Sequence, residues 1–224
     1  MVDEYLDERE QAQQLMQWFK ENWLWLATGI ALGLGGLYGW QAWNAHLDAR
    51  SREAGERFTE MLQAFEKADR ERGNELAGQI TGEYGSTPYA DQTELVLARV
   101  HADAGELDQA AFRLKKVLEG SKDAEMALVA RLRLARVQLA QGDHDAALAT
   151  LDGATSPAVA ATVAELRGDV LLAKGDKAAA LAAYRQAQEA AGPEAPAGLV
   201  DPELLQLKID DLSAAAPAGT GAGS

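Results

Sequence analysis

The strongest feature of the hydrophobic pattern is an apolar run at residues 23–43 that contains no charged side chain. As a helix, this run would span roughly 31 Å, close to the hydrocarbon thickness of a bilayer. All five tryptophans of the chain lie at or near its two ends, at Trp18, Trp23, Trp25, Trp40 and Trp43. Tryptophan is enriched at both membrane–water interfaces, so the pattern predicts a single transmembrane helix.

A soluble core helix and a cleaved signal peptide both fit the run less well. A buried helix of a soluble core has no reason to sort its tryptophans to its ends. A cleaved signal peptide begins with a basic region and has a shorter apolar segment that ends in small residues. Here residues 1–22 contain six acidic and two basic side chains, and the run ends in the bulky sequence "YGWQAWNAH". The sequence therefore favours an uncleaved membrane anchor.

The glycines of this run share one side of the predicted helix. At 100° per residue they fall within an arc of roughly 160°, and Ile30, Leu34 and Leu37 lie opposite. Small residues let membrane helices approach closely, so this side is a candidate surface for packing against another transmembrane helix. Glycine is also simply more frequent in membrane helices, which is an equally good explanation. The residues concerned are Gly29, Gly33, Gly35, Gly36 and Gly39.

After the run, three similar stretches can be aligned: residues 94–114, 131–151 and 164–184. Each contains a glycine followed by an acidic residue, an alanine five positions after the glycine, and a small residue seven positions before it. The glycine would end one helix in a left-handed conformation and the acid would cap the next. Small residues would let the two helices cross closely. The aligned glycines are Gly105, Gly142 and Gly175.

This spacing resembles that of a tetratricopeptide array, although the large consensus aromatics are missing and the first interval between glycines is three residues longer than the usual repeat. The predicted fold is all-α, with one N-terminal transmembrane helix followed by a tetratricopeptide-like right-handed α-solenoid. An irregular helical domain is the alternative. A fainter helix pair precedes the array, turning at Gly85 and Pro88.

The chain accordingly divides into five predicted segments. Residues 45–72 are expected to form one amphipathic helix with Phe58, Met61, Leu62 and Phe65 on one side. A further helix over 201–212, with a proline in its first turn, would cap the array. The segments are an acidic N-terminus (1–22), the transmembrane helix (23–43), a connecting helix (44–75), the repeat domain with its capping helix (76–213) and a disordered tail (214–224).

The charge and composition restrict the function further. The formal net charge is −14, and an acidic surface repels phosphate backbones, so nucleic-acid binding is not expected. The absence of cysteine excludes disulfides and thiol chemistry. The three histidines are isolated, and no catalytic or phosphate-binding motif is present, so we expect no enzyme activity, no metal and no cofactor.

Binding would then take place on the concave face, which the first helices line in tetratricopeptide arrays. In the alignment, Arg99, Arg136 and Asp169 occupy the same position of successive first helices. The two arginines could hold carboxylates or backbone carbonyls of an extended partner. Pairing with neighbouring acids on a solvated face is an equally good interpretation.

The order of several segments is similar to that of one family. The acidic N-terminus ending in "QQLMQWFKENW" is followed by "GIALGLGGLYGWQAW", "RLRLARVQL", "ELRGDVLLAKGDKAAALAAY" and "LLQLKIDDLS". This layout resembles the YfgM family of ancillary SecYEG translocon subunits over nearly the whole chain. The resemblance implies a single-pass protein of the bacterial inner membrane, with a cytoplasmic N-terminus and a periplasmic repeat domain.

The resemblance also implies partners: the SecYEG translocon, the membrane-anchored periplasmic chaperone PpiD, and translocating polypeptides that pass on to periplasmic chaperones. A tie to an envelope stress response is implied as well, and a membrane-tethered scaffold that sequesters a stress-response regulator is the alternative function. Lysine and arginine counts beside the run slightly favour the opposite orientation, with two before it and three after. Segments much longer than about 60 residues cross membranes largely regardless of charge, so this count does not decide the topology. Self-association is left open.

Overall fold

The computed structural model describes residues 2–192 and 200–214, and within these ranges every regular element is a helix. The prediction of an all-α fold is confirmed. The elements are α1 (Val2–Glu66), α2 (Arg70–Glu83), α3 (Pro88–Asp103), α4 (Leu107–Gly120), α5 (Ala124–Gln141), α6 (His144–Asp152), the short 3₁₀ helix η1 (Pro157–Val159), α7 (Ala160–Ala173), α8 (Lys177–Ala190) and α9 (Pro202–Ala214).

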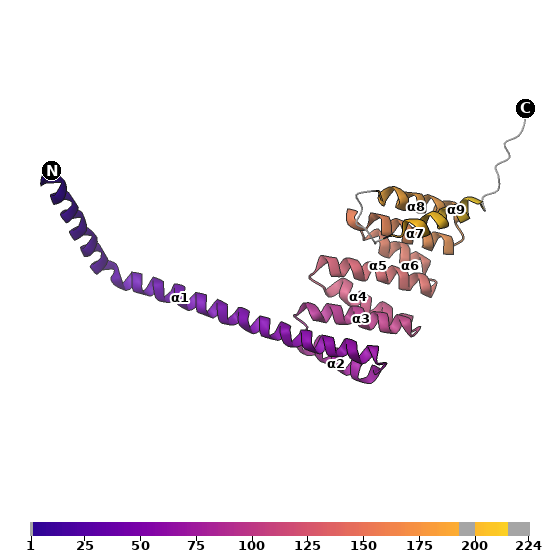
Figure 1. Ribbon diagram of the computed structural model, residues 1–224, viewed down its shortest axis with the longest axis horizontal. Helices are drawn as coiled ribbons and strands as arrows, with labels where there is room; N and C mark the ends of the chain where they lie inside the picture. The colour runs from indigo at the N-terminus through magenta and orange to yellow at the C-terminus, as the bar shows by residue number, and fades with distance from the viewer. Residues whose placement is uncertain (1, 193–199, 215–224) are drawn as a thin grey trace, which may run out of the picture. The chain divides into compact units, whose positions relative to one another are not determined.

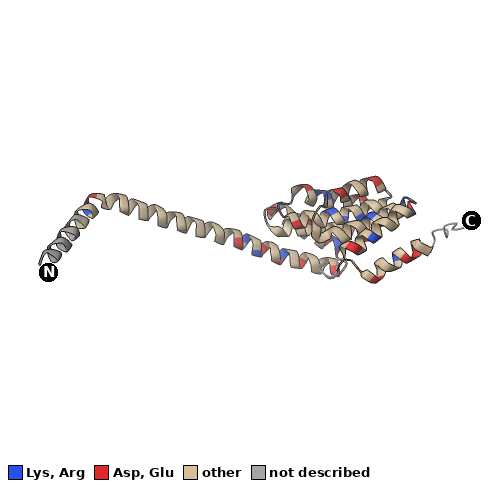
Figure 2. Cartoon of the chain, turned by 90° about the horizontal axis from the view of Figure 1, so that it is seen from above, with Lys and Arg blue, Asp and Glu red and all other residues tan. Residues whose placement is uncertain are grey.

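The chain forms two compact units, residues 1–53 and residues 54–224. The first consists of most of α1, and Figure 2 shows the stretch of this helix that carries no Lys, Arg, Asp or Glu. Ten large hydrophobic side chains of the run 23–43 are between 51% and 78% exposed. Among the described residues, none of the helices combines the length and the apolar character needed to cross a membrane. This finding does not confirm the transmembrane helix predicted for residues 23–43.

In the second unit the helices stack in pairs. Each helix from α2 to α9 contacts the next one along the chain, and Figure 1 shows the successive layers from α2 to α8. Contacts also join α3 to α5 and α5 to α7. The apolar side chains form four clusters along the stack, each shared by helices that are neighbours in sequence. This is the predicted repeat array, in which each pair covers the apolar side of its neighbour.

The three aligned glycines end the first helix of each pair as the sequence predicts. Gly105, Gly142 and Gly175 have φ angles of 76°, 79° and 87°, in the left-handed region that other residues rarely adopt. At the next position, the side chains of Asp143 and Asp176 accept a hydrogen bond from the backbone N–H three residues on. These two acids are the predicted helix caps.

Glu106, the third acid of the set, does not cap α4. It makes no side-chain bond to the backbone N–H groups of that helix, and its carboxylate instead lies 2.6 Å from Nδ1 of His101. Its pKa is lowered, first by the bond to His101 and then by the charge of Arg70. A glutamate side chain is longer than an aspartate one, so it reaches the neighbouring helix more readily than its own backbone.

The single connecting helix predicted for residues 45–72 is wrong. The helix ends at Glu66, Ala68 takes a φ of 59°, and α2 begins at Arg70. The carboxylate of Asp69 accepts a hydrogen bond from the N–H of Arg72, which caps the new helix. The last turns of α1 and α2 thus form a helix pair of their own, packed through Met61, Leu76 and Ile80.

The C-terminal helix α9 closes the other end of the stack. The carboxylate of Asp201 caps it by accepting hydrogen bonds from the N–H groups of Glu203 and Leu204. The buried side of α9 packs into the cluster of α7 and α8, through Leu205, Ile209 and Leu212. The helix predicted over 201–212 is therefore confirmed. The tail predicted as disordered lies, except for Ala214, outside the described residues.

Candidate binding pocket

The first helices of the pairs, α3, α5 and α7, follow one another in direct contact along one side of the stack. We call this side the first-helix face. Small residues at the crossings bring each first helix close to its own second helix: Ala98, Ala135 and Gly168 are buried on the first helices, and Ala110, Ala147 and Ala180 on the second. The first-helix face can therefore present longer side chains from consecutive repeats next to each other.

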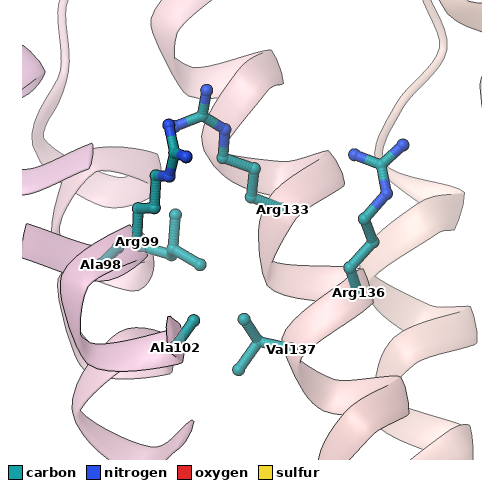
Figure 3. Close-up of a pocket in the computed structure, with 7 residues that line it drawn as sticks. Ala98, Arg99, Ala102, Arg133, Arg136 and Val137 are labelled. Atoms are coloured by element: carbon teal, nitrogen blue, oxygen red, sulfur yellow. The ribbon is translucent and has the colours of Figure 1, made fainter. Parts of the chain in front are cut away.

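Between α3 and α5 this face contains a pocket of about 300 Å³. Its floor is apolar and is formed by Ala98, Ala102, Leu114 and Val137. Three arginines surround the floor: Arg99 from α3, and Arg133 and Arg136 from α5. Figure 3 shows the guanidinium groups of Arg99 and Arg133 beside each other, with Arg136 farther along α5. We refer to this site as the arginine pocket.

Three residues are predicted from the sequence to bind a partner, and two of them lie together in the structure. Arg99 and Arg136 both line the arginine pocket, whereas Asp169 does not. The alignment missed Arg133, because it compared only one position per repeat. Arg133 and Arg136 are three residues apart in "RLRLAR", and side chains at this spacing share one side of a helix.

The arginine pocket carries positive charge that few groups compensate. Arg99 lies 3.6 Å from the carboxylate of Asp103, and both side chains are largely exposed, so this ion pair is weak. Over residues 2–192 and 200–214, neither Arg133 nor Arg136 forms a hydrogen bond or an ion pair. The pKa of Arg133 is lowered, first by partial burial of its charged group and then by the charges of Arg136 and Arg99, although Arg133 and Arg136 are both exposed residues. The three cations thus repel one another, and an anion would be favoured between them.

Asp169 instead takes part in a network that joins α7, α8 and α9. Its carboxylate accepts hydrogen bonds from Oη of Tyr184, at 2.7 Å, and from Nζ of Lys208, at 2.8 Å. The same Nζ lies 2.8 Å from Glu165. Both bonds are accepted by Oδ1 of Asp169, so this carboxylate links the three helices of the last repeat and its position is explained by the stability of that repeat.

This network predicts that the free energy of unfolding falls as the pH rises above about 10, the ordinary pKa of tyrosine. Burial and the bond to Asp169 raise the pKa of Tyr184. Burial lowers the pKa of Lys208, but its bonds to Asp169 and Glu165 raise it more, so its net shift is upward. The folded chain therefore retains protons that the unfolded chain loses, and stability declines through this range. Urea unfolding at pH 8, 10 and 11 measures the slope. The Tyr184→Phe chain should show a smaller decline, and an unchanged slope would contradict the assignment.

The predicted glycine side of α1 lies open within the first unit. Apart from its chain neighbours and the backbone of its own helix turns, an added Cβ would meet no described atom within 4 Å at Gly29, Gly33, Gly35, Gly36 or Gly39. Among the described residues of this unit, nothing therefore occupies the surface that these glycines leave, and larger side chains could be introduced there without steric conflict.

The described ranges contain no group of three or more His, Asp or Glu side chains arranged to hold a metal ion. His101 is engaged with Glu106, and His144 follows the capping residue Asp143 at the start of α6. The arginine pocket supplies positive charge and an apolar surface, which together suit the binding of an anion that carries an apolar group.

Comparison with known proteins matches most of the chain to one group of proteins. A family model described as a tetratricopeptide repeat-like domain matches residues 16–214. The chain is 34% identical over 212 residues to a protein of Escherichia coli strain K12 named ancillary SecYEG translocon subunit, covering 93% of this chain and 98% of that protein. Proteins of the same name from Neisseria gonorrhoeae and Haemophilus influenzae are 30% and 27% identical, with 93% and 92% of this chain and 98% of each relative covered.

Proposed function

The chain belongs to the family of ancillary SecYEG translocon subunits, and from this premise we propose that it is a membrane-anchored, non-enzymatic subunit of that translocon. The observation that carries this proposal is the extent of the similarity. The family model begins at residue 16, ahead of the apolar run, and ends at residue 214, after the last helix of the repeat array. Both parts of the chain therefore resemble the relatives, and a function that needs both parts is supported.

The anchor in this proposal is the run 23–43 of α1. It carries no charge, and its exposed side chains are almost all apolar. Its five glycines and four tryptophans contribute little to the mean hydropathy of the run, which is therefore modest for its length. Both residue types are nevertheless enriched in membrane-spanning helices, glycine along the span and tryptophan at the interfaces. A surface this apolar is stabilised when lipid replaces water around it.

The glycine side of the same helix is the proposed contact with the translocon. In lipid, helices gain little from hiding apolar surface, so they associate where small residues let their backbones approach. The open surface around Gly29, Gly33 and Gly36 provides such a place. A transmembrane helix of the translocon or of a membrane-anchored chaperone would pack against it.

The repeat array would then stand beside the exit of the translocon. We place the N-terminus in the cytoplasm and the array in the periplasm, as the resemblance to the family implies. There the first-helix face is offered to a partner, either the chaperone PpiD or a polypeptide that is leaving the translocon. The protein would in this way connect export to periplasmic folding factors.

Co-purification of the translocon with the tagged full-length chain tests the proposal. We expect Gly33→Leu combined with Gly36→Leu to abolish recovery of the translocon, because two leucines would hold the partner backbone away. The control is Ala27→Leu, which places a leucine on the opposite side of the helix. Equal recovery of the translocon with the wild-type and the double-variant chain would contradict the glycine contact, and no recovery with the wild-type chain would contradict the function.

A further inference from the structure

The arginine pocket combines two properties that define what it can hold. Three guanidinium groups stand around a floor of aliphatic side chains, so a fitting ligand carries negative charge next to an apolar group. A volume of about 300 Å³ is at the small end of the range for ligand sites. It accommodates one or two side chains and not a large cofactor.

The charge of the remaining chain makes this pocket distinctive. The formal net charge is −14, so an acidic ligand is repelled by most of the surface. At the pocket the sign is reversed, because Arg133 and Arg136 have no acidic partner among the described residues. An anion bound there would relieve the repulsion between the arginines, and a neutral ligand would give no such relief.

An extended polypeptide supplies both groups that the pocket needs. In an extended segment the side chains of residues i and i+2 lie on the same side, about 7 Å apart. A glutamate or aspartate at the first position can reach the guanidinium groups of Arg99 and Arg133, which lie beside each other (Figure 3). An aliphatic residue at the second position can then cover Leu114 and Val137. Carboxylates bind guanidinium groups in paired hydrogen bonds, which favours an acidic peptide as the ligand.

We propose that the arginine pocket binds an internal, extended segment of a partner polypeptide in which a carboxylate side chain and an aliphatic side chain are two residues apart. This inference rests on the proposed function, in which partners approach the first-helix face, and it names the chemistry by which they are recognised. The carboxylate lies between the arginines of α3 and α5, and the aliphatic side chain lies on the floor between these helices.

The experiment measures binding of a fluorescent peptide, with both ends capped and Glu and Leu two residues apart, to the purified full-length chain. We expect Arg133→Met to weaken binding by about tenfold or more, because it removes a charge-assisted pair. Replacing Glu by Gln in the peptide, or Leu by Ser, should weaken binding in the same way. The control is Arg185→Met, which removes an exposed arginine from α8, outside the pocket, and should leave binding unchanged.

A second readout separates binding from folding. Because Arg133 is repelled by Arg99 and Arg136, the Arg133→Met chain should unfold at the same or a higher urea concentration than the wild-type chain. Lost binding in a chain of unchanged stability supports the proposal. Equal binding of the Glu and Gln peptides overturns the proposal. It is also overturned if the chain binds phosphatidylglycerol vesicles, loses that binding with Arg133→Met, and does not bind the peptide. These measurements contain no translocon, so their failure is distinct from a failure of translocon co-purification.

Discussion

The Gly168→Ala chain is expected to lose about 2–4 kcal/mol of its free energy of unfolding. Gly168 is buried on α7, where the ring of Tyr184 from α8 packs directly against its backbone. A Cβ at this position would lie 2.5 Å from Cδ1 of that ring, and the ring is 0% exposed and cannot move into solvent. Its displacement would also weaken the hydrogen bond from Tyr184 to Asp169, which links the last three helices.

Urea unfolding of the purified full-length chain, followed by circular dichroism, measures this effect. The matched control is Gly78→Ala on α2, where an added Cβ meets nothing within 4 Å. That substitution should raise the free energy of unfolding by about 0.5–1 kcal/mol, because alanine is the better helix former. If both substitutions shifted the midpoint in the same direction, close packing at Gly168 would not be the reason for its small size.

The turns of the repeat array could be predicted because they depend on neighbouring residues only. A glycine followed by an aspartate encodes both the left-handed end of one helix and the cap of the next. This rule succeeded at Gly142 and Gly175, and the small residues at the helix crossings followed from the same spacing. No glycine or proline marks the break after Glu66. The residue that adopts the left-handed conformation there is Ala68, an alanine, which sequence rules do not associate with a helix end. The apolar pattern alone therefore predicts one continuous helix through this position.

The candidate site was predicted in part, for a different physical reason. Equal positions in successive repeats lie on one face, which correctly brought Arg99 and Arg136 to the same pocket. Whether a charged side chain is free or satisfied depends on partners that are distant in sequence. Asp169 is bound by Lys208, 39 residues away, and no local pattern indicates this contact. Arg133 was missed because it enters the pocket from a different position of the repeat.

The second large effect is expected at Glu94, whose side chain is only 4% exposed on α3. Its carboxylate lies 3.1 Å from Nη1 of Arg113 and 2.5 Å from Nζ of Lys116, both on α4. Glu94→Ala would leave these two cations without their shared anion. Breaking a fully buried ion pair costs about 3–5 kcal/mol. Because the side chains of Arg113 and Lys116 are 28% and 53% exposed, water can compensate part of that loss, and we expect about 2–3 kcal/mol.

Two further chains distinguish a lost ion pair from a lost contact. Glu119→Ala removes an exposed glutamate from α4 and should change the free energy of unfolding by no more than about 0.5 kcal/mol. Combining Glu94→Leu with Arg113→Met and Lys116→Met replaces the whole charged group by apolar side chains, and it should recover most of the stability that Glu94→Ala loses. Recovery would show that the uncompensated cations cause the loss. If the triple replacement were as unstable as Glu94→Ala, the charged group would itself stabilise the contact between α3 and α4, and uncompensated charge would not be the cause.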